Sequence, residues 1–169
     1  MKRYLKLFAI AVIGVFLLTG CEEKKKEELK EDKTEKTEKV EEKVMTCTRT
    51  ATISEGVTMS LEYTVTHDGT YVKKVKSHET VTANDSAYLE AYKKQVESIY
   101  SPYKNVEYYT YSVRVEGNTL ISDADIDYEH IDTSKMIEVD SANATLIKDG
   151  KVKVSDIKSL YATVGATCN

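Results

Sequence analysis

The sequence predicts an α+β fold: an antiparallel sheet built from two β-hairpins, with a mid-chain helix and a C-terminal helix packed on it. Apolar and polar residues alternate from Met59 to Thr66 and again from Tyr109 to Val115, which is the period of a half-buried strand. Between these segments, apolar residues recur at helical spacing. Gly-containing turn signals follow each alternating segment, so each strand is expected to fold back on itself.

The first hairpin turns at His67-Asp68-Gly69, and its returning strand runs from about residue 71 to residue 81. A two-residue loop at Asp68-Gly69 would place Tyr71 opposite Thr66, on the polar face. A three-residue loop with Gly69 left-handed places Tyr71 opposite Val65 and residue 75 opposite residue 61. We prefer this second register because it pairs apolar side chains.

The mid-chain helix begins at a cap provided by Asn84 or Asp85 and ends before Pro102. Its apolar stripe consists of Tyr88, Leu89, Tyr92, Val96 and Ile99, while Glu90, Lys93, Lys94 and Glu97 face water.

The second hairpin turns at Gly117-Asn118, which suits a type II′ turn. That turn pairs Val115 with Leu120, Tyr111 with Ala124, and Tyr109 with Ile126. Every pair is apolar, which supports this register.

Three further elements complete the domain. Asp132 and Thr133 open a short helix through residues 136 and 137, and residues 148–151 form a turn. Ser155 is expected to cap the last helix, which carries Ile157, Leu160, Tyr161 and Val164 and ends at Gly165.

The chain begins with Lys2, Arg3 and Lys6, followed by an apolar run from residue 7 to residue 18 and by Leu18-Thr19-Gly20-Cys21. The apolar run is shorter than the roughly 20 residues that a bilayer span needs, so residues 1–20 are predicted to be a cleaved signal. The four residues that end at Cys21 resemble a bacterial lipobox, which predicts a diacylglyceryl thioether on Cys21. The alternative is an ordinary secretory signal in which Cys21 has no such role.

Residues 21–43 are expected to be a charged flexible tether that begins at the lipidated cysteine. Residues 22–43 contain ten acids and eight lysines, with Leu29 and Val40 as the clearly apolar members, so this segment cannot build a core. Residues 44–169 then form a single domain. Removal of the signal deletes three cations and moves the formal net charge from −4 to −7, which argues against nucleic acid as a partner.

Asp123, Asp125 and Asp127 alternate along the second hairpin and imitate half of a calcium-binding loop. The required Gly and Glu are replaced by Tyr128 and Ser134. We therefore interpret these acids as a solvated face that blocks pairing at a sheet edge. His67, His78 and His130 are scattered and form no zinc motif, and no nucleophile elbow or phosphate loop is present in the sequence.

Tyrosine must supply the bulk of the core, because the chain has no Trp and its two Phe residues lie in the predicted signal. The tyrosines expected to fill the core are Tyr63, Tyr88, Tyr92, Tyr109 and Tyr111. Tyr71, Tyr103 or Tyr108 could instead form an exposed recognition surface. Of these, Tyr108 should stand on the outside, near Asp127.

This order of elements resembles the YehR-like lipoproteins, small bacterial lipoproteins built on a domain of unknown function. The resemblance covers about residues 45–168. It rests on the layout, on Cys47-Thr48-Arg49-Thr50, on Ile126-Asp127-Tyr128 and on Cys168. The resemblance implies the α+β fold and the lipid-anchored location of a lipoprotein. It assigns no active-site residues.

Cys47 and Cys168 are predicted to form a disulfide. With Cys21 committed to lipid, two cysteines remain, and the exported compartment permits their oxidation. They bracket the domain, whose ends are expected to lie close together. The alternative is a pair of reduced thiols.

These observations predict a lipoprotein on the extracytoplasmic face of the bacterial cell membrane, with the membrane as its partner through the diacylglyceryl anchor. The domain is expected to be a binding or interaction module for an envelope protein or a small ligand. We expect no catalytic residues, no cofactor and no metal. The alternatives are a metal- or solute-capturing lipoprotein associated with transport, and a cell-envelope hydrolase, for which the sequence offers no motif.

Overall fold

The computed structural model describes residues 41–169, of which residues 42–169 form one compact unit. The predicted signal peptide, the lipidated Cys21 and nearly all of the predicted tether lie outside the described residues. The first described strand begins at Lys43.

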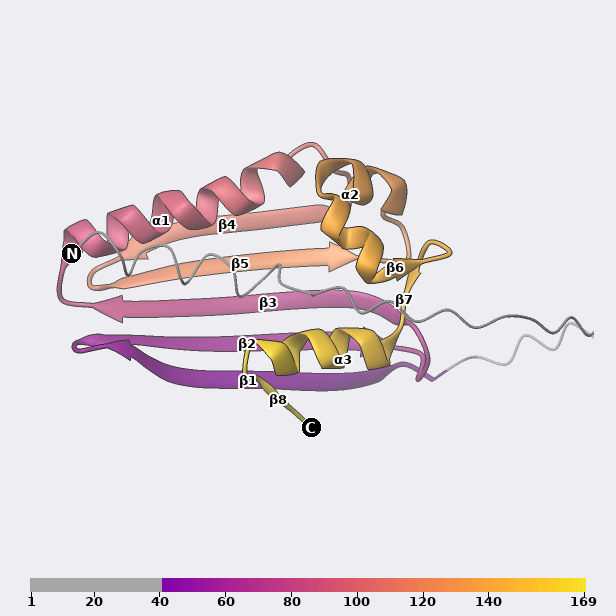
Figure 1. Ribbon diagram of the computed structural model, residues 1–169, viewed down its shortest axis with the longest axis horizontal. Coiled ribbons are helices and arrows are strands. Elements are labelled where there is room, and N and C mark those ends of the chain that lie inside the picture. The colour runs from indigo at the N-terminus through magenta and orange to yellow at the C-terminus, as the bar shows by residue number, and fades with distance from the viewer. Residues whose placement is uncertain (1–40) are drawn as a thin grey trace, which may run out of the picture. The chain divides into compact units, whose positions relative to one another are not determined.

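The unit is built on a six-stranded sheet in the order β4-β5-β3-β2-β1-β8, in which every neighbouring pair is antiparallel (Figure 1). The sequence predicts the class, the two hairpins and a first strand at Cys47, but not the pairing of β1 with β2 or the short last strand β8. The strands are β1 (Lys43–Ser54), β2 (Val57–His67), β3 (Val72–Ala83), β4 (Tyr109–Glu116), β5 (Thr119–Asp127) and β8 (Thr167–Cys168).

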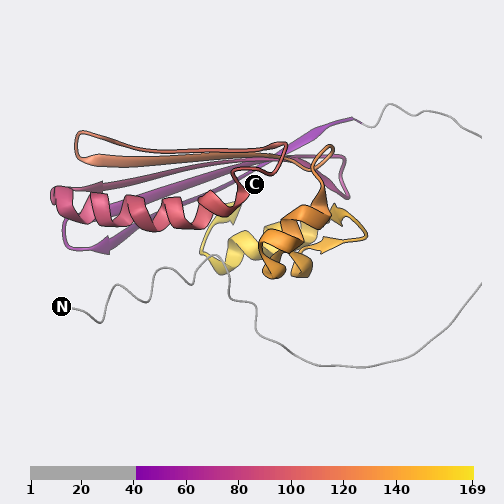
Figure 2. The same ribbon diagram turned by 90° about the horizontal axis from the view of Figure 1, so that it is seen from above.

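Three α-helices lie on one side of this sheet and leave the other side open (Figure 2). They are α1 (Ser86–Tyr100), α2 (Thr133–Val139) and α3 (Val154–Thr163). Two 3₁₀ turns, η1 (Ser101–Tyr103) and η2 (Ser141–Thr145), and a small hairpin of β6 (Ile147–Lys148) and β7 (Lys151–Val152) complete the layer.

The register of β2 with β3 differs from the predicted one. Val65 lies opposite Val75, not Tyr71, and Leu61 lies opposite Glu79. The cause is a longer loop, because the Asp68 carboxylate accepts hydrogen bonds from the backbone N–H groups of Thr70 and Tyr71. The displacement is four residues, an even number, so each side chain keeps its predicted face.

The β4–β5 hairpin has the predicted register. Tyr109 pairs with Ile126, Tyr111 with Ala124, and Val115 with Leu120. Gly117 has a φ of 61°, which a left-handed first turn position requires and which glycine adopts without steric cost.

The helix boundaries are close to those predicted. Asp85 caps α1, Pro102 lies just beyond its end, and Asp132 caps α2. The last helix is an exception, because it begins one residue before Ser155, with Lys153 at the N-cap position. The Ser155 hydroxyl bonds instead to the carboxylate of Asp156.

Two groups of buried residues hold the helices on the sheet. One, including Val81, Leu89 and Leu120, lies beneath α1, and the other, including Val65 and Tyr161, lies beneath α2 and α3. All five tyrosines predicted to fill the core belong to these groups or pack against them. Tyrosine therefore supplies the aromatic bulk that Phe and Trp provide in most cores.

Candidate functional site

The open face of the sheet is mostly polar, with Ile121 on β5 and the exposed Val44 on β1 among its few apolar side chains. Its β1 and β2 positions are mostly Thr and Ser, while β3 contributes Lys74, Lys76 and His78. The facing strand β5 contributes the predicted acidic row. A face with so few apolar side chains needs no covering layer, so it remains available to solvent and to a ligand.

A shallow hollow of about 440 Å³ lies at the centre of this face. Adjacent strands contribute pairs of polar side chains to it: Glu62 and Thr64 from β2, Lys76 and His78 from β3, Asp123 and Asp125 from β5, and Thr110 and Ser112 from β4. The hollow therefore offers carboxylate, ammonium, imidazole and hydroxyl groups within one small area.

The acidic row is an ion-pair ladder, not an edge-blocking device. β5 lies between β4 and β3, so the prediction that its acids protect a sheet edge is wrong. Each acid faces a base on β3: Asp123 lies 2.6 Å from His78, Asp125 lies 3.4 Å from Lys76, and Asp127 lies 3.1 Å from Lys74. Such exposed pairs contribute little to stability, so their main effect is to fix the positions of the charges.

Asp123 is the most connected of these acids. One carboxylate oxygen lies 2.6 Å from Nδ1 of His78, while the other accepts hydrogen bonds from Arg114 at 2.7 Å and Ser112 at 3.3 Å. The hydrogen bond with His78, together with that from Arg114, lowers the pKa of Asp123. Asp123 is therefore ionised and held in place at the wall of the hollow.

Glu62 stands on the other side of His78, directly opposite it across the β2–β3 pair. It is exposed, and no cation within residues 41–169 pairs with it. Glu62, Asp123 and Asp125 outnumber Lys76, the one Lys among the residues that line the hollow.

The three histidines do not converge. Nδ1 of His67 accepts a hydrogen bond from the Gly69 N–H, His78 lies beside Asp123, and His130 lies 3.0 Å from Asp127. No three His, Cys, Asp or Glu side chains in the described part of the chain lie close enough together to hold a metal ion.

Of the three tyrosines predicted to be exposed, Tyr108 is 46% exposed and Tyr71 is half-buried beneath Lys151. Tyr103 is buried, because its ring stacks on Tyr109 and its hydroxyl accepts a hydrogen bond from Asn143. Tyr108 has a φ of 65°, which is rare outside glycine, and lies against the ring of His130.

Glu79 is a polar site that the sequence analysis missed. It lies on the helix side of β3, where its carboxylate accepts hydrogen bonds from Tyr92 at 2.7 Å and from Ser122 at 3.1 Å. Burial raises its pKa, and these two hydrogen bonds offset only part of the effect. The sequence does indicate that Glu79 points inward. It lies an even number of residues from Val75 and Val81, so it falls on the same apolar face of an alternating strand.

Cys47 and Cys168 are joined by a disulfide, as predicted. They lie directly opposite each other on β1 and β8, with their Cα atoms 3.9 Å apart. The bond ties the C-terminus to the edge of the sheet. None of the helices in residues 41–169 has the length and apolarity that crossing a membrane requires.

No protein-family model matches the chain, and no curated protein matches its sequence. Among solved structures it is similar to the NMR structure of Escherichia coli YehR, with 16% identity over 75% of this chain and 91% of YehR, and a TM-score of 0.50. It is also similar to an NMR structure of a Streptococcus pneumoniae TIGR4 protein, with 15% identity over 90% of this chain and 99% of that one, and a TM-score of 0.47. The likeness to YehR is a likeness of fold.

Proposed function

We propose that this chain is a lipid-anchored extracytoplasmic protein of the YehR-like kind, and that the open face of its sheet binds a polar partner in the cell envelope. The lipobox-like Leu18-Thr19-Gly20-Cys21 supports the anchor. The fold shared with YehR supports the kinship. We propose binding without turnover.

The hollow on the open face is the observation that carries this proposal. It draws polar side chains from four strands, and their ion pairs hold them in fixed positions. A preorganised polar surface loses less conformational entropy when it binds a partner, which favours recognition. We do not propose metal capture, because the described residues contain no cluster suited to it.

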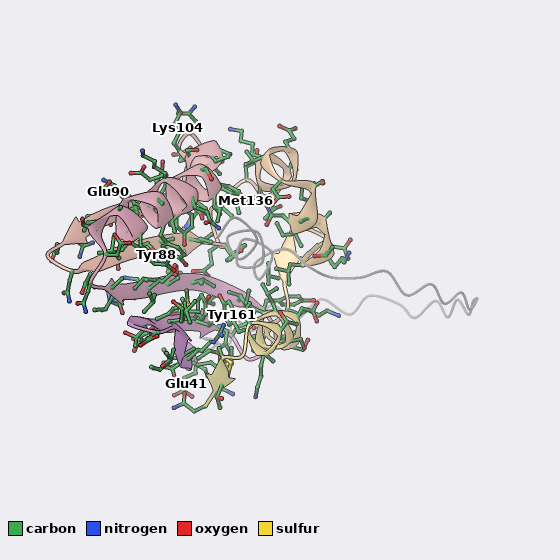
Figure 3. The ribbon with its side chains drawn as sticks, turned by 60° about the vertical axis from the view of Figure 1, so that its left-hand side comes forward. Glu41, Tyr88, Glu90, Lys104, Met136 and Tyr161 are labelled. Carbon is green, nitrogen blue, oxygen red and sulfur yellow. A yellow bond between two sulfur atoms is a disulfide. The ribbon has the colours of Figure 1, made fainter. Side chains whose placement is uncertain are left out.

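Site-specific photocrosslinking in cells that produce the full chain tests the proposal. A photoreactive residue at Thr110, which is exposed at the hollow, should give one discrete crosslinked product. The same residue at Glu90, on the outer side of α1 (Figure 3), is the matched control and should give none.

Adding Asp123→Asn to the Thr110 variant should weaken the crosslink, because Asp123 organises His78, Arg114 and Ser112. Equal crosslinking from both positions, or none from Thr110, would contradict a binding role for the open face.

A further inference from the structure

Glu79 is a carboxylate without a compensating cation. Within residues 41–169, every acid of the β5 row has a basic partner, whereas no Lys, Arg or His lies within ion-pair distance of Glu79. Tyr92 and Ser122 supply one hydrogen bond to each of its oxygens. A carboxylate has about four lone-pair positions, so roughly half of its accepting capacity remains.

Tyrosines surround this carboxylate. Its negative charge helps to raise the pKa of Tyr63 to about 12 and also raises the pKa values of Tyr88, Tyr92 and Tyr100, although burial is the larger cause in each case. Tyr63 comes from β2, and the other three come from α1. Tyr63 also stacks on Tyr161 of α3, with ring centroids 3.9 Å apart. Phenol groups from β2 and α1 thus border one negative charge, and Tyr161 of α3 packs on one of them.

These groups are reachable from solvent. Tyr63, Ser77 and Glu79 point to the helix side, yet each is only half-buried, whereas Val65 and Val81 on the same strands are fully buried. Helix α1 lies over the β4 and β5 side of the sheet and α3 over the β1 and β2 side (Figure 1). Tyr88 and Tyr161 lie on the sheet-facing sides of these helices (Figure 3). On β2 and β3, the helix side is therefore less completely covered between the buried pairs Val65–Val75 and Met59–Val81 than at those pairs.

We infer that Glu79 and the surrounding tyrosines bind a primary ammonium group carried on an alkyl chain. An ammonium has three N–H donors, which match the free lone pairs of Glu79 and the phenol oxygens, and it supplies the missing positive charge. The methylene groups would lie against the tyrosine rings, which also attract a nearby cation. This site lies on the face opposite the hollow, so it does not depend on the proposed function of the open face.

Isothermal titration calorimetry of the full-length chain with n-butylammonium chloride tests the inference, with 1-butanol as the neutral control. The ammonium should bind and the alcohol should not. Glu79→Gln removes the charge and replaces one acceptor oxygen with an NH2 donor of similar size, and it should weaken ammonium binding by about tenfold or more. Glu90→Gln removes an exposed carboxylate from the outer side of α1, away from both sites, and should leave the affinity unchanged.

A second titration uses the unmodified chain and so does not depend on the folding of a variant. Binding of n-butylammonium should weaken as the pH falls and Glu79 becomes protonated. A blocked lysine, N-acetyl-lysine methylamide, distinguishes the possible sources of the ammonium: tighter binding than n-butylammonium indicates a lysine side chain, and weaker binding indicates a small amine. Absence of ammonium binding, equal binding of 1-butanol, or an unchanged affinity in Glu79→Gln would overturn the inference.

Discussion

Glu79 shows how burial can outweigh two hydrogen bonds in setting the pKa of a single residue. Two hydroxyls hold its carboxylate, yet burial raises its pKa above the ordinary value. Because the folded state favours the protonated form, the stabilising contribution is complete below the unfolded-state pKa and is lost as the pH rises through the folded-state pKa.

The substitution Glu79→Gln should therefore stabilise the protein increasingly as the pH rises. At about pH 4 the variant and the original chain should have similar free energies of unfolding, and at about pH 7 the variant should be the more stable. Urea unfolding at both pH values measures the difference, with Glu62→Gln as an exposed control. If the difference in free energy of unfolding between Glu79→Gln and the original chain shrinks with rising pH, the fold stabilises Glu79 in its ionised form.

Arg49 is a second residue with a specific structural role. Its guanidinium donates a hydrogen bond of 2.6 Å to the carbonyl of Val164, where α3 ends, and it lies against Gly165. Its positive charge also suits the negative end of the helix dipole. Arg49 thus links β1 to the C-terminus of α3.

Replacing Arg49 with Ala should cost roughly 1 to 3 kcal/mol, since a part-buried carbonyl loses a charged donor. Arg114→Ala, which removes exposed ion pairs, should cost less stability than Arg49→Ala. Thermal or urea unfolding distinguishes the two variants. Equal losses would show that the contact between Arg49 and Val164 contributes no more than a surface pair.

At the scale of single residues, the sequence predicted the tyrosine core correctly, because alternation and helical spacing determine which side chains point inward. It did not predict the burial of Tyr103 or the hydrogen bonds of Glu79. Both depend on contacts between segments distant in the sequence, Tyr103 with Asn143 and Glu79 with Ser122.

At the scale of elements, turn length decided which strand pairings could be predicted. The two-residue turn at Gly117-Asn118 leaves one favourable register, and the prediction for β4 and β5 was correct. The loop between β2 and β3 is longer, and its hydrogen bonds to Asp68 could not be read from alternation alone. The position of β5 inside the sheet was missed for a related reason, because local patterns do not reveal which hairpins become neighbours.

The disulfide is the most strongly constraining link between elements. It closes a separation of 121 residues, and restriction of the unfolded chain gives an expected stabilisation of about 2 to 5 kcal/mol. The double variant Cys47→Ser with Cys168→Ser should lose stability in that range. Urea unfolding of the double variant and of the reduced original chain should show a similar loss in the free energy of unfolding.

Thiol counting provides the control for this prediction. Under denaturing, non-reducing conditions, neither Cys47 nor Cys168 should react with a thiol reagent. Reaction of both cysteines would contradict the bond, and an unchanged stability of the double variant would show that it contributes little.

At the scale of the whole molecule, residues 42–169 account for the described sheet, its helices and both candidate sites. Residues 22–41 contain almost no apolar residues, so they have little to contribute to a core. Deleting residues 22–41 should therefore change the melting temperature by less than about 2 °C. Thermal unfolding followed by circular dichroism measures this, and a drop of several degrees would show that the segment stabilises the domain.

The attachment of this domain to a membrane is the central claim, and mass spectrometry of the N-terminus of the native protein tests it most directly. The account predicts a mature chain that begins at Cys21 and carries a diacylglyceryl group on its sulfur. Cys21→Ala should abolish that modification and release the domain or stall the precursor. A mature chain with an unmodified Cys21, or one that begins at another residue, would contradict the lipoprotein assignment.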